Sequence, residues 1–187
     1  MKLWFFSKSN SLMEPEIIKT YYKSSYDSIL VGKLTLGSDG TNLIGLWFDN
    51  QKPLVDNKEC ILIEKDLPVF NLTKNWLDRY FKGEKPKINE IPIKLIGTEF
   101  RKRVWNLLLN IPYGKVITYG DISKLIYEKG PNNSKIIGGT VGNNPISIIV
   151  PCHRVNGSKN KLTGYAGGLI NKVRLLKLEK VDISKMH

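Results

Sequence analysis

The chain has 187 residues, 41% of them hydrophobic, which is enough to bury a core in one compact domain or in two small ones. Its 29 Lys and Arg residues outnumber 17 Asp and Glu residues, giving a net charge of +12, and it contains only two cysteines and two histidines. So few cysteines and histidines, far apart in the chain, argue against a structural zinc site and against a disulfide framework. No apolar run has the length of a signal sequence or a membrane span. We therefore expect a soluble cytoplasmic protein, or a nuclear one in a eukaryote.

The first half of the chain predicts a β-hairpin followed by a helix. Residues 28–36 and 41–48 are rich in aliphatic and aromatic residues, and Ser38-Asp39-Gly40 between them is a turn sequence. Residues 83–97 contain two prolines and predict a connecting segment. Between the hairpin and this connector a helix is predicted to end at Lys82-Gly83, with an apolar face formed by Leu72, Trp76, Leu77, Tyr80 and Phe81.

The second half predicts several helices. Thr98 is a plausible N-cap for the first helix, and Thr118 with Asp121 has the spacing of a capping box for the second. The second helix should stop at Gly130-Pro131, and a third should run from Asn133 or Ser134 to about residue 143. Two short helices joined in this way predict a helix-turn-helix.

The third of these helices contains Gly138, Gly139 and Gly142. Each glycine costs a helix about 0.5 to 1 kcal/mol relative to alanine, so their presence needs a reason. Glycine allows close approach of another backbone, which is either a neighbouring element of the protein or the groove of a nucleic acid. Lys135, at the start of the helix, could contact a phosphate, although a single lysine is usually only solvated.

An apolar run, residues 148–150, ends at Pro151 and is followed by Cys152. The run predicts a strand, and a free cysteine after it is by default a packed core residue. His153 and Arg154 are seldom buried without partners, so the sulfur is expected where the strand reaches polar surroundings. Cationic or hydrogen-bonding groups there would favour the thiolate, which is the nucleophilic form.

Most of the positive charge lies in the half that contains this cysteine. Residues 1–97 carry 14 basic and 12 acidic side chains, whereas residues 98–187 carry 15 and 5. A basic half attracts a polyanion, usually a nucleic acid. Charge alone leaves open a general role in solubility.

Several short motifs of the second half follow one another in the order found in a known family. They are Thr118-Tyr119-Gly120, Ile137-Gly138-Gly139, Asn143-Asn144-Pro145, the PCHRV motif at 151–155, the segment 164–169, and 175–179. Together they resemble the methylated-DNA-protein-cysteine methyltransferases, which repair 6-O-alkylguanine, over residues 98–180. Residues 1–92 resemble the amino-terminal domain of that family only in position and coarse pattern.

The resemblance implies an α/β (α+β) fold in two domains. Residues 1–92 would form an α/β domain with a ribonuclease-H-like fold, built from the β-hairpin and the helix. Residues 93–187 would form a mostly helical domain that binds DNA through a winged-helix-like helix-turn-helix and carries the alkyl acceptor.

The resemblance also implies roles at the acceptor. Cys152 would attack the alkyl carbon, while His153 takes the thiol proton through a water and Glu179, on a final helix expected over about 168–180, orients the imidazole. Adjacent residues on a regular strand face opposite ways, which makes a direct bond between Cys152 and His153 doubtful. Tyr119 would donate to the departing guanine, and Asn144 would brace the DNA-binding helix.

Further residues are implied in DNA binding and in the pocket for the base. Lys135 stands where many members have the arginine that replaces the extruded base, and lysine cannot stack or make a planar bidentate contact. Ala166 stands where some members have serine. The residues implied in DNA binding are Lys135, Gly138, Gly139, Thr140, Tyr119 and Arg154. The residues implied in the substrate pocket are Val155, Tyr165, Ala166, Gly167 and Cys152.

The implied reaction is used once per protein molecule. A base stacked in a duplex must be extruded to reach a cysteine, and the glycine-bearing helix would dock in the minor groove. The thioether product has no carbonyl for water to attack, so we expect a single turnover by a monomer, with no metal and no cofactor. Three alternatives stay open, which are a lesion-binding protein without transfer, a helix-turn-helix regulator and a cysteine hydrolase.

Overall fold

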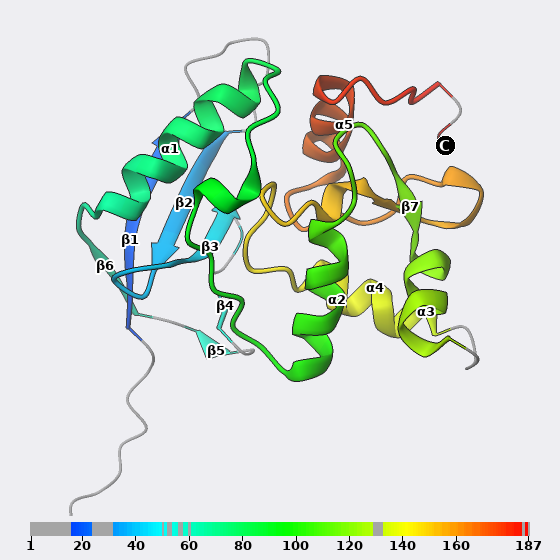
Figure 1. Cartoon of the computed structure of the whole chain (residues 1–187), viewed down its shortest axis with the longest axis horizontal. Coiled ribbons are helices and arrows are strands. Elements are labelled where there is room, and N and C mark those ends of the chain that lie inside the picture. The colour runs from blue at the N-terminus through cyan, green and yellow to red at the C-terminus, as the bar shows by residue number, and fades with distance from the viewer. Residues whose placement is uncertain are drawn as a thin grey trace, which may run out of the picture.

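The computed structural model describes residues 16–23, 32–49, 51, 54–55, 58–59, 61–128, 133–184 and 186. They form a first half in which one helix covers a β-sheet and a second half that is mostly helical, side by side in Figure 1. The predicted α/β architecture is therefore confirmed. Among the described helices, none is long and apolar enough to cross a membrane.

The first half is built on a four-stranded mixed sheet with the order β3-β2-β1-β6. The predicted hairpin is confirmed, since β2 and β3 pair antiparallel, whereas β1 pairs parallel with β6. The early part of the first predicted strand, residues 28–31, lies outside the described residues. The bounds are β1 Glu16–Lys23, β2 Lys33–Ser38, β3 Leu43–Phe48 and β6 Ile61–Glu64, with a separate short pair, β4 Leu54–Val55 and β5 Lys58–Glu59.

Helix α1, Pro68–Phe81, packs on this sheet. Pro68 suits the first turn, where a backbone N–H would have no helical partner. The predicted apolar spacing places Trp76, Leu77, Tyr80 and Phe81 in the core, while Leu72 stays half exposed. The helix ends where predicted, before Gly83.

The second half contains four helices among its described residues. Thr98 Oγ1 accepts from the N–H of Arg101, and Thr118 and Asp121 form the predicted capping box. The predicted stop of the second helix, Gly130-Pro131, lies outside the described residues. The bounds are α2 Glu99–Leu109, α3 Tyr119–Tyr127, α4 Ser134–Gly142 and α5 Leu169–Leu178.

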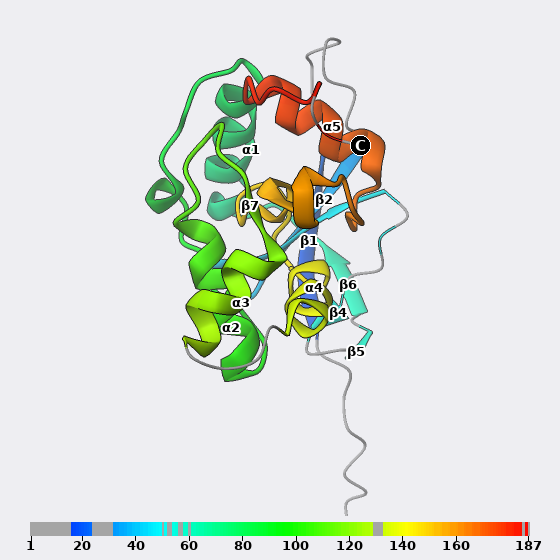
Figure 2. The same cartoon turned by 90° about the vertical axis from the view of Figure 1, so that its right-hand side faces the viewer.

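A short parallel pair of strands lies between the helices of the second half. β7, Ile117–Thr118, pairs with β8, Val155–Asn156. Figure 2 shows α5 at one end of this half and α2, α3 and α4 toward the other. The segment that follows Cys152 therefore lies between α5 on one side and α2, α3 and α4 on the other.

Strand β3 joins the two halves. Its Leu46 N–H donates to the carbonyl of Pro145 at 2.9 Å, and its carbonyl accepts from the N–H of Ser147 at 3.0 Å. The connector binds the same strand, because Lys94 N–H donates to the Leu43 carbonyl at 2.9 Å. One continuous hydrophobic core spans both halves. The backbone that leads to Cys152 is therefore anchored to the first half.

The prediction of a strand over residues 148–150 is wrong. Ile148 has a φ of +69°, and the N–H groups of Ile149 and Cys152 each donate two residues back, to Ser147 and Val150. Cys152–Arg154 then form a turn of 3-10 helix. The run is apolar because it is buried in the core, and a buried turn and a buried strand share that composition.

Candidate active site around Cys152

The thiol of Cys152 is enclosed and held by one amide. The residue is 4% exposed, and Asn144 Nδ2 donates to its sulfur at 3.0 Å. The same amide contacts the carbonyl of Val150 at 2.8 Å, while Asn144 Oδ1 accepts from the N–H of Ile146 at 3.0 Å. Asn144 follows α4 directly, so it ties the acceptor turn to the end of that helix.

Burial controls the protonation of this thiol. It raises the pKa of Cys152 to about 11, while the Asn144 amide and the charge of Lys172 act in the opposite direction. Neighbouring groups do favour the thiolate, as expected, but the effect of burial is larger and favours the neutral thiol. Cys152 rests as a neutral thiol at neutral pH and needs a base before it can act as a nucleophile.

His153, the residue after Cys152, forms a buried pair with Glu179. His153 Nε2 lies 2.8 Å from Glu179 Oε1, and both side chains are buried. Burial lowers the pKa of His153, although Glu179 raises it in part, so the imidazole is neutral. Since the carboxylate can only accept, Nε2 carries the hydrogen and Nδ1 is an acceptor. Among the described residues, this buried Nδ1 has no hydrogen-bond partner.

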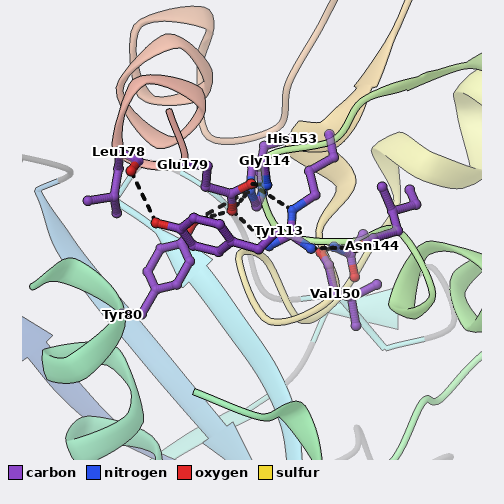
Figure 3. A network of polar contacts seen from close by, with 10 residues as sticks. Tyr80, Tyr113, Gly114, Asn144, Val150, His153, Leu178 and Glu179 are labelled. Carbon is purple, nitrogen blue, oxygen red and sulfur yellow. Dashed lines mark hydrogen bonds and ion pairs between the residues drawn. The ribbon is translucent and has the colours of Figure 1, made fainter. Parts of the chain in front are cut away.

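The carboxylate of Glu179 is surrounded by donors from several parts of the chain (Figure 3). Arg154 donates from Nε to Oε2 and from Nη2 to Oε1, both at 2.8 Å. Tyr80 Oη donates to Oε1 at 2.6 Å, and the N–H of Gly114 donates to Oε2 at 3.2 Å. Although burial alone would raise the pKa of Glu179, the bonds from His153 and Arg154 hold it well below its usual range. Glu179 is therefore an ionised acceptor.

Two of the residues expected to bind DNA do not lie on the surface. Arg154 is buried, with its guanidinium bound to Glu179 and to the carbonyl of Ile111 at 2.6 Å. Thr140 is also buried, and its hydroxyl donates to the carbonyl of Ile136 at 3.0 Å. Both side chains are committed inside the protein, so we leave them out of the proposed DNA contacts.

The other expected DNA contacts lie on or beside helix α4. Lys135 and Gly139 are exposed. An added Cβ at Gly138 would lie 3.9 Å from the ring of Tyr119, whereas one at Gly139 or Gly142 would meet nothing within 4 Å. Of the two reasons considered for these glycines, close approach by a neighbouring element of the protein finds no support at Gly139 and Gly142.

Of the residues expected to form the pocket, Tyr165 and Val155 lie at the acceptor turn, and Gly167 packs against strand β3. Tyr165 meets the ring of His153 edge-on at 6.4 Å and that of Phe48, from strand β3, at 5.6 Å. An added Cβ at Gly167 would lie 2.4 Å from the Phe48 ring, so glycine is required there. Ala166 is exposed, and Val155 is buried beside Cys152.

Sequence reasoning missed Lys172. Its side chain is buried, and Nζ donates to the carbonyls of Val155 at 2.5 Å and Thr163 at 3.0 Å. Burial lowers its pKa to about 8. A signal was present, because Lys172, Leu175, Leu176 and Glu179 have the i, i+3, i+4, i+7 spacing of one helix face. Two charged residues, Lys172 and Glu179, on an otherwise apolar helix face indicate buried side chains that form hydrogen bonds inside the protein.

Tyr80, Tyr113 and Gly114 were also missed as parts of the site. Tyr113 Oη donates to the carbonyl of Leu178 at 3.1 Å, and Gly114, with a φ of +74°, leaves room for the backbone of Glu179.

In the part of the chain that the structure describes, no group of three or more His, Cys, Asp or Glu residues could hold a metal ion. Cys60 and His187 lie outside that part.

Two family models match the chain. The DNA binding domain of 6-O-methylguanine DNA methyltransferase matches residues 99–181, and its ribonuclease-like domain matches residues 21–95. The methylated-DNA–protein-cysteine methyltransferase of Haemophilus influenzae is 40% identical over 162 residues, which cover 87% of this chain and 86% of the relative. The protein of that name from Mycobacterium tuberculosis is 40% identical over 150 residues, covering 80% and 87%.

A solved structure agrees with these matches. The crystal structure of Mycobacterium tuberculosis OGT in complex with DNA superposes with a TM-score of 0.71 at 38% identity, covering 88% of this chain and 92% of that one. In this chain the match to the ribonuclease-like domain precedes the match to the DNA binding domain. This chain belongs to the 6-O-methylguanine DNA methyltransferase family.

Proposed function

We propose that this protein repairs 6-O-alkylguanine in DNA by transferring the alkyl group to Cys152. The activity of a methylated-DNA–protein-cysteine methyltransferase follows from membership of the family. One observation supports Cys152 as the acceptor. Asn144 donates a hydrogen bond to its sulfur, and the next residue is a neutral His153 that Glu179 orients.

The protein side of the reaction follows from these contacts. A water between the thiol and Nδ1 of His153, which has no hydrogen-bond partner among the described residues, would carry the thiol proton to the imidazole, and Glu179 would stabilise the imidazolium that forms. The sulfur forms a bond to the alkyl carbon while the bond from that carbon to the guanine oxygen breaks. The electron pair stays on that oxygen, and a proton passed to the base, for which Tyr119 is the proposed donor, restores guanine.

The product explains a single turnover. The thioether on Cys152 has no carbonyl for water to attack, so the thiol is not regenerated and one protein molecule repairs one lesion. This chemistry needs no metal and no organic cofactor. The protein would act as a monomer, in a compartment that holds DNA and keeps thiols reduced.

The chain binds DNA, and we propose that helix α4 is the element that docks. The exposed glycines make α4 slim enough for a minor groove, and Lys135 would contact phosphate and fill the place of the extruded nucleotide. Tyr165, Ala166, Gly167 and Val155 would line the pocket that receives the base.

We further propose that the domains comprise residues 1–92 and 93–187. The match to the ribonuclease-like domain ends at residue 95, and the match to the DNA binding domain begins at residue 99. This gap supports a boundary in the connector. The halves share one core, so the boundary separates two folding patterns rather than two independent bodies.

The test is the intact mass of the protein after incubation with a duplex oligonucleotide that carries one 6-O-methylguanine. We expect a gain of one methylene, at most one per molecule, which Cys152→Ala abolishes. Cys60→Ala is the matched control and should keep the gain. An unchanged mass despite tight binding would instead indicate a lesion-binding protein.

A further inference from the structure

Helix α1 of the first half places one polar atom in the site of the second half. Tyr80 is 1% exposed, and its hydroxyl donates to Glu179 Oε1 at 2.6 Å. The same hydroxyl lies 3.5 Å from His153 Nε2. The two residues that share the short bond are 99 positions apart in the chain, and the bond crosses between the two family matches.

Aromatic packing fixes the position of this hydroxyl. The Tyr80 ring stacks on Trp76, with centroids 5.3 Å apart and planes 10° apart. Phe81 and Tyr113 meet it edge-on at 5.5 and 6.1 Å. A ring held on three sides delivers its hydroxyl to one place, and Figure 3 shows it directed at the Glu179 carboxylate.

We propose that Tyr80 is a positioning residue for alkyl transfer, through which the first half of the chain completes the Glu179–His153 pair. The proposal rests on the proposed function. The Tyr80 hydroxyl donates to Glu179, so it acts through the carboxylate that orients the base.

The bond has a definite electrostatic consequence. Tyr80, His153 and Arg154 all donate to Glu179 Oε1. A donor on that oxygen withdraws part of the negative charge that His153 faces, so the imidazole holds an added proton less strongly. Burial and the nearby Glu179 raise the pKa of the Tyr80 phenol well above its usual value, so the hydroxyl remains a donor.

Other groups around the pair also change the pKa of His153. Arg154 and Lys172 oppose protonation of His153, and Glu179 favours it. Tyr113, from the loop after α2, also faces the Glu179 charge. The titratable and charged groups around the pair are Tyr80 on α1, Tyr113 after α2, Cys152 and Arg154 on the acceptor turn, Tyr165 before α5, and Lys172 on α5.

The experiment compares Tyr80→Phe with Tyr22→Phe. Tyr22 is a matched control, because it is also buried in the first half and donates to a carboxylate, Asp78 Oδ1, at 2.7 Å. The rate constant of methyl transfer from a 6-O-methylguanine duplex is measured as a function of pH for both variants and the wild type. Circular dichroism checks that each variant is folded.

We expect Tyr80→Phe to slow transfer on the order of tenfold or more, because Glu179 loses the donor that fixes the carboxylate in place to orient His153, a loss of the size of one hydrogen bond to a charged group. The acidic limb of its pH profile should move to higher pH, because His153 must be neutral to take the thiol proton. Tyr22→Phe should leave the profile in place. A fluorinated tyrosine at position 80, which is a stronger donor of the same shape, should restore the rate and move the limb to lower pH.

The outcomes separate this proposal from the proposed function. An active wild type with an unchanged rate or an unshifted acidic limb in Tyr80→Phe overturns the role of Tyr80 alone. An equal loss in Tyr22→Phe does the same, because it shows a general effect of the first half. A wild type that takes up no methyl group overturns both.

Discussion

Glu179 keeps its charge inside the protein because five donor groups surround its two oxygens. The carboxylate in turn is the partner of the buried Arg154 and of the neutral His153. A buried ion of this kind is stable only while its partners are in place. At the scale of single residues, catalysis and stability therefore depend on the same contacts.

Glu179 should make the stability of the fold depend on pH. Its pKa is lower in the folded protein than its usual value of 4.5, so it stabilises the fold above that pH and loses this contribution as the pH falls. Glu179→Gln should lower the free energy of unfolding near neutral pH by about 3 to 5 kcal/mol, because Arg154 loses its partner. Urea titrations should show the difference from wild type shrinking below pH 4.5, and a constant difference would contradict the account.

Asn144 should assist ionisation of the thiol. Asn144→Ala removes the donor to the sulfur, so the pKa of Cys152 should rise further and its reaction with iodoacetamide at a given pH should slow. Asn143→Ala is the control, because that neighbouring amide donates to the carbonyl of Gly139 instead. Both variants are measured in a Cys60→Ala background, and equal rates for the two would refute this role.

The glycines of helix α4 lower the stability of the helix and lie on the face proposed to bind DNA. Gly139 is exposed, and a side chain there would meet nothing within 4 Å, yet glycine weakens the helix. A residue that costs stability and fills no tight contact in the protein is expected where function needs it. At the scale of the element, the glycines mark the face that we propose meets DNA.

Gly139→Ala should therefore have opposite effects on stability and binding. The free energy of unfolding should rise by about 0.5 to 1 kcal/mol through helix propensity, while affinity for duplex DNA should fall because a methyl group occupies the docking face. Asn106→Ala, at an exposed position of α2, should stabilise the fold and leave DNA affinity unchanged. Unchanged DNA affinity in Gly139→Ala would remove α4 from the interface.

Local sequence patterns predict single elements of this fold but not the contacts between its halves. Helix α1, the capping box at Thr118 and the β2–β3 hairpin follow from local spacing and caps, and all three are confirmed. Residues 148–150 were misread because a buried turn is as apolar as a buried strand. The bond between Tyr80 and Glu179 joins residues 99 apart and depends on how the halves pack, which no local pattern contains.

The whole molecule is polarised in charge, and strand β3 is one of the elements that join its halves. Most of the net charge of +12 lies in residues 98–187, the half that contains α4 and Cys152. Strand β3 binds both the connector and the backbone before the acceptor turn, so the first half holds the acceptor loop in place. The charge should draw DNA to this half of the molecule, while β3 anchors the backbone that leads to the acceptor.

Binding to DNA should weaken steeply as salt increases, because contacts to phosphates release counterions. Lys135→Ala should reduce the slope of log affinity against log salt by about one. Lys65→Ala removes the same charge from an exposed position in the first half and should leave the slope unchanged. Equal slopes for all three proteins would show that Lys135 makes no phosphate contact.

The central claim is that Cys152 is the alkyl acceptor. The most direct test is peptide mapping by mass spectrometry of wild-type protein after reaction with a duplex that carries 6-O-methylguanine. We expect one added methyl group, on the peptide that contains Cys152, and an unmodified peptide around Cys60. A methyl group on Cys60, or transfer that leaves Cys152 unmodified, would contradict it.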